Sequence, residues 1–313
     1  MDITYIVFGI VLLCAVLFDL GLISKKSKTI TIRKAFYQTA FWIVLAMAFG
    51  VFIWVKNGQG MALEYLSAYL MEWSLSIDNI FVFVLIFGFF QISDNYIGRV
   101  LLMGILMAIL FRVIFITVGI ALVARFYWIL YMFGAFLIYT GVKMFFVNED
   151  EEFEPSENIV YKILKRFIPI TTQEPRGKYT MLVQGKRHFT ILFVVVIILA
   201  TTDIVFALDS IPAVFAITQH KLVIYTSNIF AVLGLRSLFF LLKGAVNKFD
   251  YLQQGIAIVL VFIGVKMLIE YFHIYIPIWV SLIVIIACLG GSIVFSFYHD
   301  KIKVDDSVIR TDV

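Results

Sequence analysis

Long apolar runs separated by short polar stretches cover most of this chain. A helix needs about 20 predominantly apolar residues to cross a hydrocarbon core of about 30 Å, and runs of this length recur throughout the sequence. We expect nine such spans, near residues 3–23, 35–55, 65–90, 98–122, 126–147, 189–211, 222–242, 252–271 and 276–298. The pattern predicts an all-α polytopic membrane protein.

Composition points to the same class. Of the 313 residues, 62% are hydrophobic and 15% are charged, whereas about 25% of the residues of a soluble domain are charged. The first apolar run is long, its positive charges follow it and it has no small-residue cleavage site, so we expect a retained span rather than a removable signal. The formal net charge of +4 comes from basic loops, which excludes a nucleic-acid surface.

Lysine and arginine gather in alternate loops, and this asymmetry predicts the orientation of the chain in the membrane. With nine spans, 18 of the 25 Lys and Arg residues fall in the loops of one side and the C-terminal tail, whereas the other side has only Lys56, Arg125 and Lys221. The basic side is expected to be cytoplasmic. The N-terminus is therefore predicted to lie outside and the C-terminus in the cytoplasm.

Two three-span segments, 65–147 and 189–271, carry the same ionisable residues in the same order. The first segment has Glu72, Asp78, Arg112 and Lys143, and the second has Asp203, Asp209, Arg236 and Lys266. Six positions separate the acids in each segment, and the tetrapeptide Gly-Val-Lys-Met occurs at 141–144 and at 264–267. Ionisable groups are costly in hydrocarbon, so a set that occurs twice predicts a functional site.

A unit of three spans ends on the opposite side of the membrane from its start, so its copy must insert upside down. Inverted repeats of this kind place a substrate site near the midplane, where the two halves meet. The other segments are expected to be two N-terminal helices with a basic cytoplasmic loop (1–64), an acidic cytoplasmic linker (148–188), and a last helix with a cytoplasmic tail (272–313).

The paired acids lie among other side chains that carry oxygen. These neighbours within the spans are Ser76, Asn79, Thr202 and Ser210. Residues six apart are about 9 Å apart along an ideal helix and about 120° apart around it, so two acids of one repeat cannot share an ion on a straight helix. Either the helix is locally unwound, or one acid from each repeat meets at a common centre.

Pro212 favours local unwinding in the second repeat. Proline removes a backbone hydrogen bond and clashes with the carbonyl four residues earlier, here that of Leu208. Carbonyls freed near Leu208 and Asp209 would be additional oxygen ligands. The first repeat has Phe81 at the equivalent position, so the two repeats differ at this point.

The acids and bases of the two repeats balance in number, so they could be ion pairs that only hold helices together. Hydrophobic packing would do this at a lower desolvation cost, which favours a functional site. Arg112 and Arg236 either neutralise an empty site or contact the substrate. Lys143 and Lys266 are placed to snorkel toward the headgroups, and Lys266 could also pair with Glu270 one turn on.

Asp19 is a further acid inside a predicted span. It lies near the expected cytoplasmic end of the first span and outside both repeats. It either pairs with Lys25 or Lys26 or contributes to function.

The side chains near the paired acids indicate which ligand they would bind. All four histidines lie at span ends, and neither Cys14 nor Cys288 accompanies the acids, which disfavours copper or zinc. Carboxylate, amide and carbonyl oxygens select hard divalent ions such as Mn²⁺, Mg²⁺ or Ca²⁺. Motifs of metalloproteases, serine hydrolases and P-loop pumps are lacking in the sequence, so we expect a protein that is not an enzyme.

Four segments resemble the signature segments of the TerC/Alx family of bacterial integral membrane proteins. They are Glu72-Trp-Ser-Leu-Ser-Ile-Asp78-Asn79, Trp128-Ile-Leu-Tyr-Met-Phe-Gly-Ala-Phe-Leu-Ile-Tyr-Thr-Gly-Val-Lys143, Asp203-Ile-Val-Phe-Ala-Leu-Asp209-Ser210-Ile-Pro212 and Thr226-Ser-Asn228-Ile-Phe-Ala-Val-Leu-Gly-Leu-Arg236. The resemblance implies a relative of LysE-type transporters in the bacterial inner membrane, a link to tellurite resistance, and manganese efflux. It places the acidic site on Glu72, Asp78, Asp203 and Asp209, with Asn79 and Asn228 as neighbours.

We therefore expect a secondary transporter that exports Mn²⁺ from the cytoplasm, with proton counter-movement as the energy source. Mn²⁺ would be a transported substrate, and no cofactor is expected. We expect the protein to be surrounded by the lipid bilayer, and the sequence does not identify membrane or secreted protein partners. One alternative is an anion or organic-solute transporter that uses Arg112 and Arg236. Another is a membrane scaffold that delivers metal to secreted enzymes or anchors a stress complex through the linker 148–188.

Overall fold

The computed structural model describes the backbone of residues 3–24, 31–146, 162, 164, 166, 168–171, 177–183, 185–243, 251–272 and 274–311. Within these ranges it describes all side chains except those of residues 3, 16, 18–24, 78, 81, 146, 209, 252–253 and 297–311. The side chains of Asp19, Asp78 and Asp209 therefore lie outside the described part of the structure, as does most of the predicted acidic linker.

Helices make up nearly all of the described chain, as predicted. They are α1 (Ile3–Ser24), α2 (Ile32–Asn57), α3 (Gln59–Phe89), α4 (Asp94–Arg125), α5 (Ile129–Phe146), α7 (Ile191–Ile217), α8 (Lys221–Leu233), α9 (Leu235–Leu242), α10 (Leu252–Ile269) and α11 (Ile278–Thr311). Within the described residues, six helices are long and apolar enough to cross a membrane, or seven if α8 and α9 form one bent span; two shorter apolar helices lie at 4–15 and 129–145. The number nine stays a prediction.

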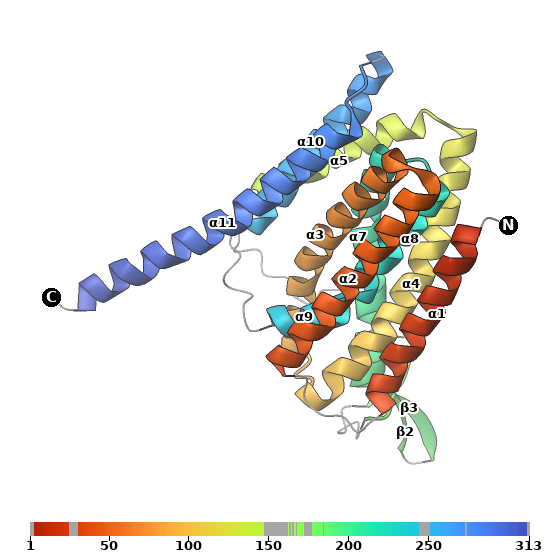
Figure 1. Cartoon of the computed structure of the whole chain (residues 1–313). Coiled ribbons are helices and arrows are strands. Elements are labelled where there is room, and N and C mark those ends of the chain that lie inside the picture. Colours follow the sequence, from red (N-terminus) through yellow and green to blue (C-terminus); the bar gives the residue numbers. More distant parts are fainter. Residues whose placement is uncertain are drawn as a thin grey trace.

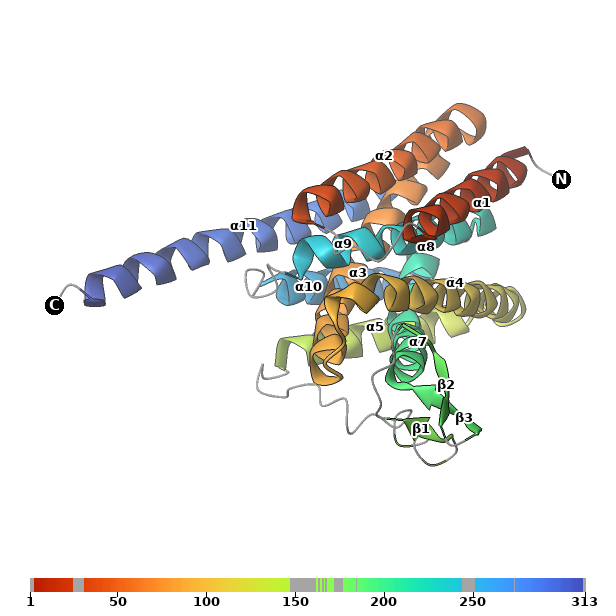
Figure 2. The same ribbon diagram turned by 90° about the horizontal axis from the view of Figure 1, so that it is seen from below.

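Four helices form the centre of the bundle (Figures 1 and 2): α4 packs against α7, and α3 packs against both α7 and α8. Helix α2 packs against α3 and α9, while α10 packs against α5 and α11. The two kinds of helix differ in their buried faces. Nearly every residue of α8 is buried, whereas α2 exposes Val44 and Trp54, as expected of a helix with one face toward lipid.

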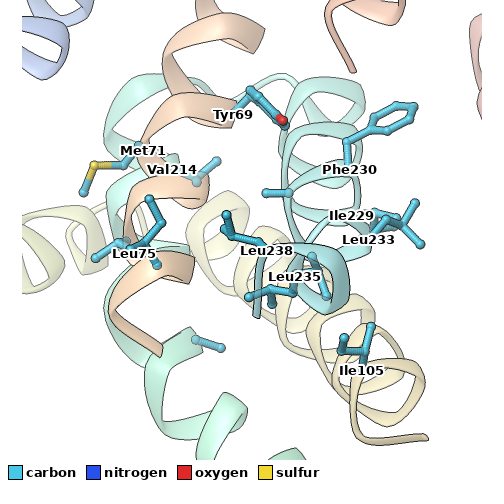
Figure 3. Close-up of a cluster of buried hydrophobic side chains, with 14 of the residues drawn as sticks. Tyr69, Met71, Leu75, Ile105, Val214, Ile229, Phe230, Leu233, Leu235 and Leu238 are labelled. Carbon is cyan, nitrogen blue, oxygen red and sulfur yellow. The ribbon is translucent and has the colours of Figure 1, made fainter. Parts of the chain in front are cut away.

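Apolar side chains from α3, α4, α7, α8 and α9 fill the space between these helices. Figure 3 shows Met71 and Leu75 on one side of the cluster and Ile229, Leu235 and Leu238 across from them. Side chains of this size stabilise the packing through many small dispersion contacts. The bundle therefore has a dense interior, in which any polar group is conspicuous.

Helices α5 and α10 cross at very close range. A Cβ atom on Gly264 would lie 2.6 Å from the carbonyl oxygen of Gly134, and one on Gly141 would lie 2.8 Å from that of Ala257. Only glycine allows the two backbones to approach in this way. Because early residues of α5 meet late residues of α10 and the reverse, the two helices run antiparallel.

A small sheet lies where α7 begins, and we call this end of the bundle the sheet end. Strand β3 (Lys186–Thr190) pairs in parallel with β1 (Ile170–Thr171) and in antiparallel with β2 (Thr180–Val183). The Tyr179 hydroxyl beside β2 donates to the carbonyl of Arg99 on α4, at 3.4 Å, and burial raises the pKa of this hydroxyl while the charge of Arg99 opposes the rise. The linker was not predicted to contain strands.

The predicted break at Pro212 is wrong. Helix α7 continues through this proline to Ile217, because dense packing on a buried residue can hold a helix that has lost one backbone bond. The break lies in the other half of the second repeat instead. Helices α8 and α9 meet at Gly234 with a bend of 40°.

Candidate ion site at the centre of the bundle

Arg112 lies halfway along α4 and is 1% exposed. Its Nε donates to Oδ2 of Asp203 at 2.8 Å and its Nη2 to Oδ1 of the same carboxylate at 2.9 Å. Its Nη1 donates to Oε1 of Glu72 and, at 3.2 Å, to Oδ1 of Asn228. All three nitrogens are therefore engaged, and the guanidinium joins α3, α4, α7 and α8.

Glu72 and Asp203 are the equivalent acids of the two repeats, and both contact Arg112. The second of the two predicted arrangements, in which one acid from each repeat meets at a common centre, is the one the structure has. It arises because α3 and α7 pack against each other and against their neighbours, which brings both acids to the middle of α4. The sequence pattern left this choice open.

Asn228 is oriented by its own helix. Its Nδ2 donates to the carbonyl of Ile224 one turn earlier, at 3.2 Å, so its oxygen is the atom presented to Arg112. Thr226 and Ser227 likewise donate to carbonyls of α8. The amide oxygen of Asn228 is consequently held in a fixed position facing the centre.

Some buried oxygens on these helices have no hydrogen-bond partner in the described part of the structure. They are Oγ of Ser76 and Oγ1 of Thr202, while the Ser210 hydroxyl lies within hydrogen-bonding reach of the Glu72 carboxylate. A buried polar atom without a partner costs about 1–3 kcal/mol. Ser76 follows Glu72 by one helical turn and Thr202 directly precedes Asp203, so both oxygens lie on the same helices as the two acids.

The charges of the side chains described at this centre do not balance. With Glu72 and Asp203 ionised, two negative charges surround one guanidinium, and an unpaired buried charge is strongly unfavourable. Among the described side chains, no group of three His, Cys, Asp or Glu forms a ready-made metal site. The described centre therefore has donors for a cation but is closed around Arg112.

A small void lies next to Asp203 on its sheet-end side. Its volume is about 10 Å³, close to the space one water molecule needs. Leu101 and Gly104 of α4 and Leu199 of α7 are among the residues that line it. Apolar side chains thus separate the ionic centre from the sheet end of the bundle.

The other predicted site residues lie at different depths. Asn79 is 3% and Arg236 is 3% exposed, whereas Lys143 is exposed near the sheet end of α5. Lys266 is partly buried near the C-terminal end of α10, which lies at the end of the bundle opposite the sheet. There its ammonium donates to the Ser281 hydroxyl at 3.1 Å. Lys143 and Lys266 therefore lie far from the centre around Arg112.

Sequence patterns assigned no role to Glu64. It lies on α3 and accepts a hydrogen bond from Thr218, at the start of the connection between α7 and α8. A carboxylate near the end of a span looks like an ordinary boundary residue, and its partner is more than 150 positions away. Only the packing of α3 beside α7 brings the two together.

A helical bundle that could cross a membrane several times and that holds a buried ionic centre defines a polytopic integral membrane protein with a transporter-like core. The profile of the "Integral membrane protein TerC family" matches residues 57–303, so this chain belongs to the TerC family. The family predicted from the four signature segments is confirmed.

Relatives cover nearly the whole chain. An uncharacterized membrane protein of Myxococcus xanthus is 44% identical over 90% of this chain and 88% of its own length, and one of Rickettsia felis is 40% identical over 94% and 97%. A protein of Photorhabdus laumondii, provisionally named as a membrane-bound redox modulator Alx, is 37% identical over 96% of each chain. No solved structure matches this chain.

Proposed function

We propose that this protein is a secondary transporter that exports a divalent metal ion, Mn²⁺, from the cytoplasm. The observation that carries the proposal is the buried centre, in which acids from two different helices surround one guanidinium beside oxygens without partners. Intramembrane ionisable groups mark ion pathways. Asp78 and Asp209, the second acids of the repeats, complete the proposed pathway.

Helix packing supports inverted repeats. If the helices of the first repeat, α3, α4 and α5, correspond to α7, α8 with α9, and α10, then the contact of α4 with α7 corresponds to that of α3 with α8, and both occur. The close glycine contacts between α5 and α10 are related in the same way. In the aligned repeats Gly141 corresponds to Gly264, and Gly134 to Ala257. The contact of Gly264 with Gly134 therefore corresponds to the contact of Gly141 with Ala257, and both occur.

Arg112 acts in this proposal as a tethered cation that occupies the place of the metal. A divalent ion that binds Glu72 and Asp203 must loosen at least one of the contacts of the guanidinium, since all three of its nitrogens are engaged. Two positive species near two carboxylates repel each other. The arginine would therefore return when the ion leaves, which resets the site without an external ligand.

The donor chemistry favours a hard ion. The oxygens at the centre belong to carboxylates, hydroxyls and an amide, and these donors suit Mn²⁺, Mg²⁺ and Ca²⁺ better than copper or zinc. The choice of Mn²⁺ rests on the resemblance of the sequence to manganese exporters of its family. It is a proposal about cargo, and the donor set alone fits all three ions.

The contacts of Arg112 disfavour the alternative of an anion transporter. An anionic substrate would need free guanidinium donors, and here Nε, Nη1 and Nη2 all donate to side chains of the protein. Such a substrate would also approach two carboxylates. Cation export needs only that the acids exchange one positive partner for another.

We further propose that the sheet end faces the cytoplasm of a bacterial inner membrane, because most Lys and Arg residues lie in loops at that end. Protons moving inward would drive export, with buried carboxylates binding either a proton or the metal. An acid that takes a proton from the outside and a metal from the inside couples the two flows.

The deciding experiment measures Mn²⁺ efflux from proteoliposomes for the wild type, Asp78→Asn and Asp209→Asn. Each substitution removes one ligand charge at nearly constant volume, so efflux should be abolished while membrane abundance stays near that of the wild type. Asp94→Asn is the matched control, because this acid lies at the start of α4 and forms only an exposed pair with Lys243. Efflux at the wild-type rate in both Asp78 and Asp209 variants would refute the proposal.

A further inference from the structure

A second polar cavity, of about 250 Å³, lies at the end of the bundle opposite the sheet. Glu64 of α3, the connection between α7 and α8, and the last turn of α10 line it. Ile274 to Ile276 and Ile278 at the start of α11 complete the lining, so the cavity lies where the central helices meet the end of α10 and the beginning of α11. We call it the outer cavity, because the proposed orientation places it on the external face.

Glu64 is fixed on one side of the outer cavity. The Thr218 hydroxyl donates to Oε2 of Glu64 at 2.5 Å, and the backbone N–H of His220 donates to the Thr218 hydroxyl at 3.0 Å. Nε2 of His220 lies 3.8 Å from the same carboxylate oxygen. A carboxylate and an imidazole from two separate segments therefore face one space.

Lys266 is fixed on the other side. Its ammonium donates to Ser281 of α11, and the carboxylates of Glu270 and Glu64 line the same cavity. Glu270 follows Lys266 by one helical turn. The cavity therefore repeats the design of the centre, since carboxylates from different helices are balanced by one basic side chain held in place by the protein.

We propose that the outer cavity is the release site of the exported ion and that it binds a hydrated divalent cation. This inference rests on the proposed function. The cation would be attracted by Glu64 and Glu270 and opposed by the ammonium of Lys266, so its residence is brief. A release site of this kind must bind weakly, because an exporter has to let its ion go.

The cation keeps its water shell in this proposal for two reasons. No group of three His, Cys, Asp or Glu among the described residues is arranged to hold a bare ion. The space of about 250 Å³ also exceeds the roughly 200 Å³ of an ion with six waters at about 30 Å³ each. Carboxylates commonly bind such ions through water, as Mg²⁺ sites do.

The outer cavity is distinct from the central site. Thr218 follows Asp203 by 15 residues on α7 and its extension, which corresponds to roughly 22 Å at 1.5 Å per residue. The two sites can therefore be altered separately. A charge change at the outer cavity is expected to leave the contacts of Arg112 intact.

The test measures Mn²⁺ binding to the purified full-length protein in detergent, from the loss of the electron-spin-resonance signal of the free ion. Water-proton relaxation then reports whether the bound ion keeps its waters. Glu64→Gln combined with Glu270→Gln should weaken binding at least tenfold, whereas Lys266→Gln should strengthen it several-fold. Lys221→Gln, an exposed lysine near the same rim, is the matched control and should change binding little.

Opposite signs for the two sets of variants would establish the site, because a purely structural ion pair gives no gain on removal of the lysine. Equal binding in all variants, or weaker binding in Lys266→Gln, would overturn it. Asp203→Asn separates this result from the proposed function. If it leaves the outer binding intact while efflux is absent even in the wild type, the cavity binds cations and the export proposal fails.

Discussion

The two repeats carry the same charged residues but place them in different surroundings. In the first repeat Arg112 lies in an unbroken helix and is bound to acids of both repeats. In the second, Arg236 follows the bend at Gly234. Lys143 is exposed, whereas its counterpart Lys266 borders the outer cavity. Sequence symmetry thus coexists with structural asymmetry, and the two ends of the bundle differ in their charged side chains.

The largest effect is expected from removing the central arginine. Arg112→Gln leaves Glu72 and Asp203 facing each other without a cation, and breaking a buried pair in this way costs about 3–5 kcal/mol. Thermal unfolding in detergent should show a large loss of stability. Arg125→Gln, at the exposed end of the same helix, should change stability by less than about 0.5 kcal/mol.

The arginine substitution also tests the comparison between the repeats. If Arg112→Gln and Arg236→Gln were equally destabilising, the two arginines would be equivalent despite their different helices. Mn²⁺ at millimolar concentration should restore part of the stability of Arg112→Gln, since a divalent ion can replace the lost charge. If Mn²⁺ stabilised the wild type by the same amount, that explanation would be wrong.

The next effect concerns the glycines that join the repeats. Gly264→Val would push a side chain into the backbone of α5, and overpacking of this kind costs about 1–3 kcal/mol. The unfolding temperature of the purified protein should fall. Gly290→Ala is the control, because nothing lies within 4 Å of a Cβ atom there; a similar fall in both variants would remove the special role of the α5 and α10 contact.

Proton coupling should give a smaller, graded effect. One pH unit across the membrane supplies about 1.4 kcal/mol per proton, so Mn²⁺ efflux should rise when the outside is more acidic. Glu72→Gln, which cannot take up the proton, should flatten this dependence. Flux in proteoliposomes at clamped membrane potential checks it, and a rate indifferent to the pH gradient in the wild type would exclude proton antiport.

The smallest effect is expected from the linker. Deleting residues 149–157 removes an acidic run that lies between the repeats and outside the proposed pathway, so efflux should stay within about twofold of the wild type. Loss of efflux in a normally inserted variant would favour the scaffold alternative, in which this segment anchors other proteins.

Much of the candidate site could be predicted from the sequence, because ionisable residues inside apolar runs are conspicuous. Glu72, Asp203 and Arg112 stood out in this way. Their mutual contacts could not be predicted, since the order of charges along the chain says nothing about which helices become neighbours. The packing of α3 against α7 and α8 decides that, and it depends on apolar surfaces that look alike in every span.

Helix breaks and turns, which depend on the backbone properties of proline and glycine, were predicted less well. Pro212 was expected to break its helix, yet the bend lies at Gly234, a residue that weakens helices by about 1 kcal/mol. The sheet was missed because Gln184-Gly185 is not one of the strong two-residue hairpin signals, which are Asn-Gly, Asp-Gly and Gly-Gly. Gly185 has a φ of +77°, the left-handed conformation that such turns favour.

The burial and hydrogen bonding of Arg112 also make it a probe of motion at the centre of the protein. Its guanidinium is shut away from water and makes four hydrogen bonds to three side chains, so its hydrogens can exchange with deuterium only when the helices around them separate. The exchange rate of this one side chain therefore reports on the opening of the centre, and it equals the opening rate where every opening leads to exchange. An exporter that turns over by exposing its centre must open it at least once per ion carried, so the opening rate is an upper limit on transport.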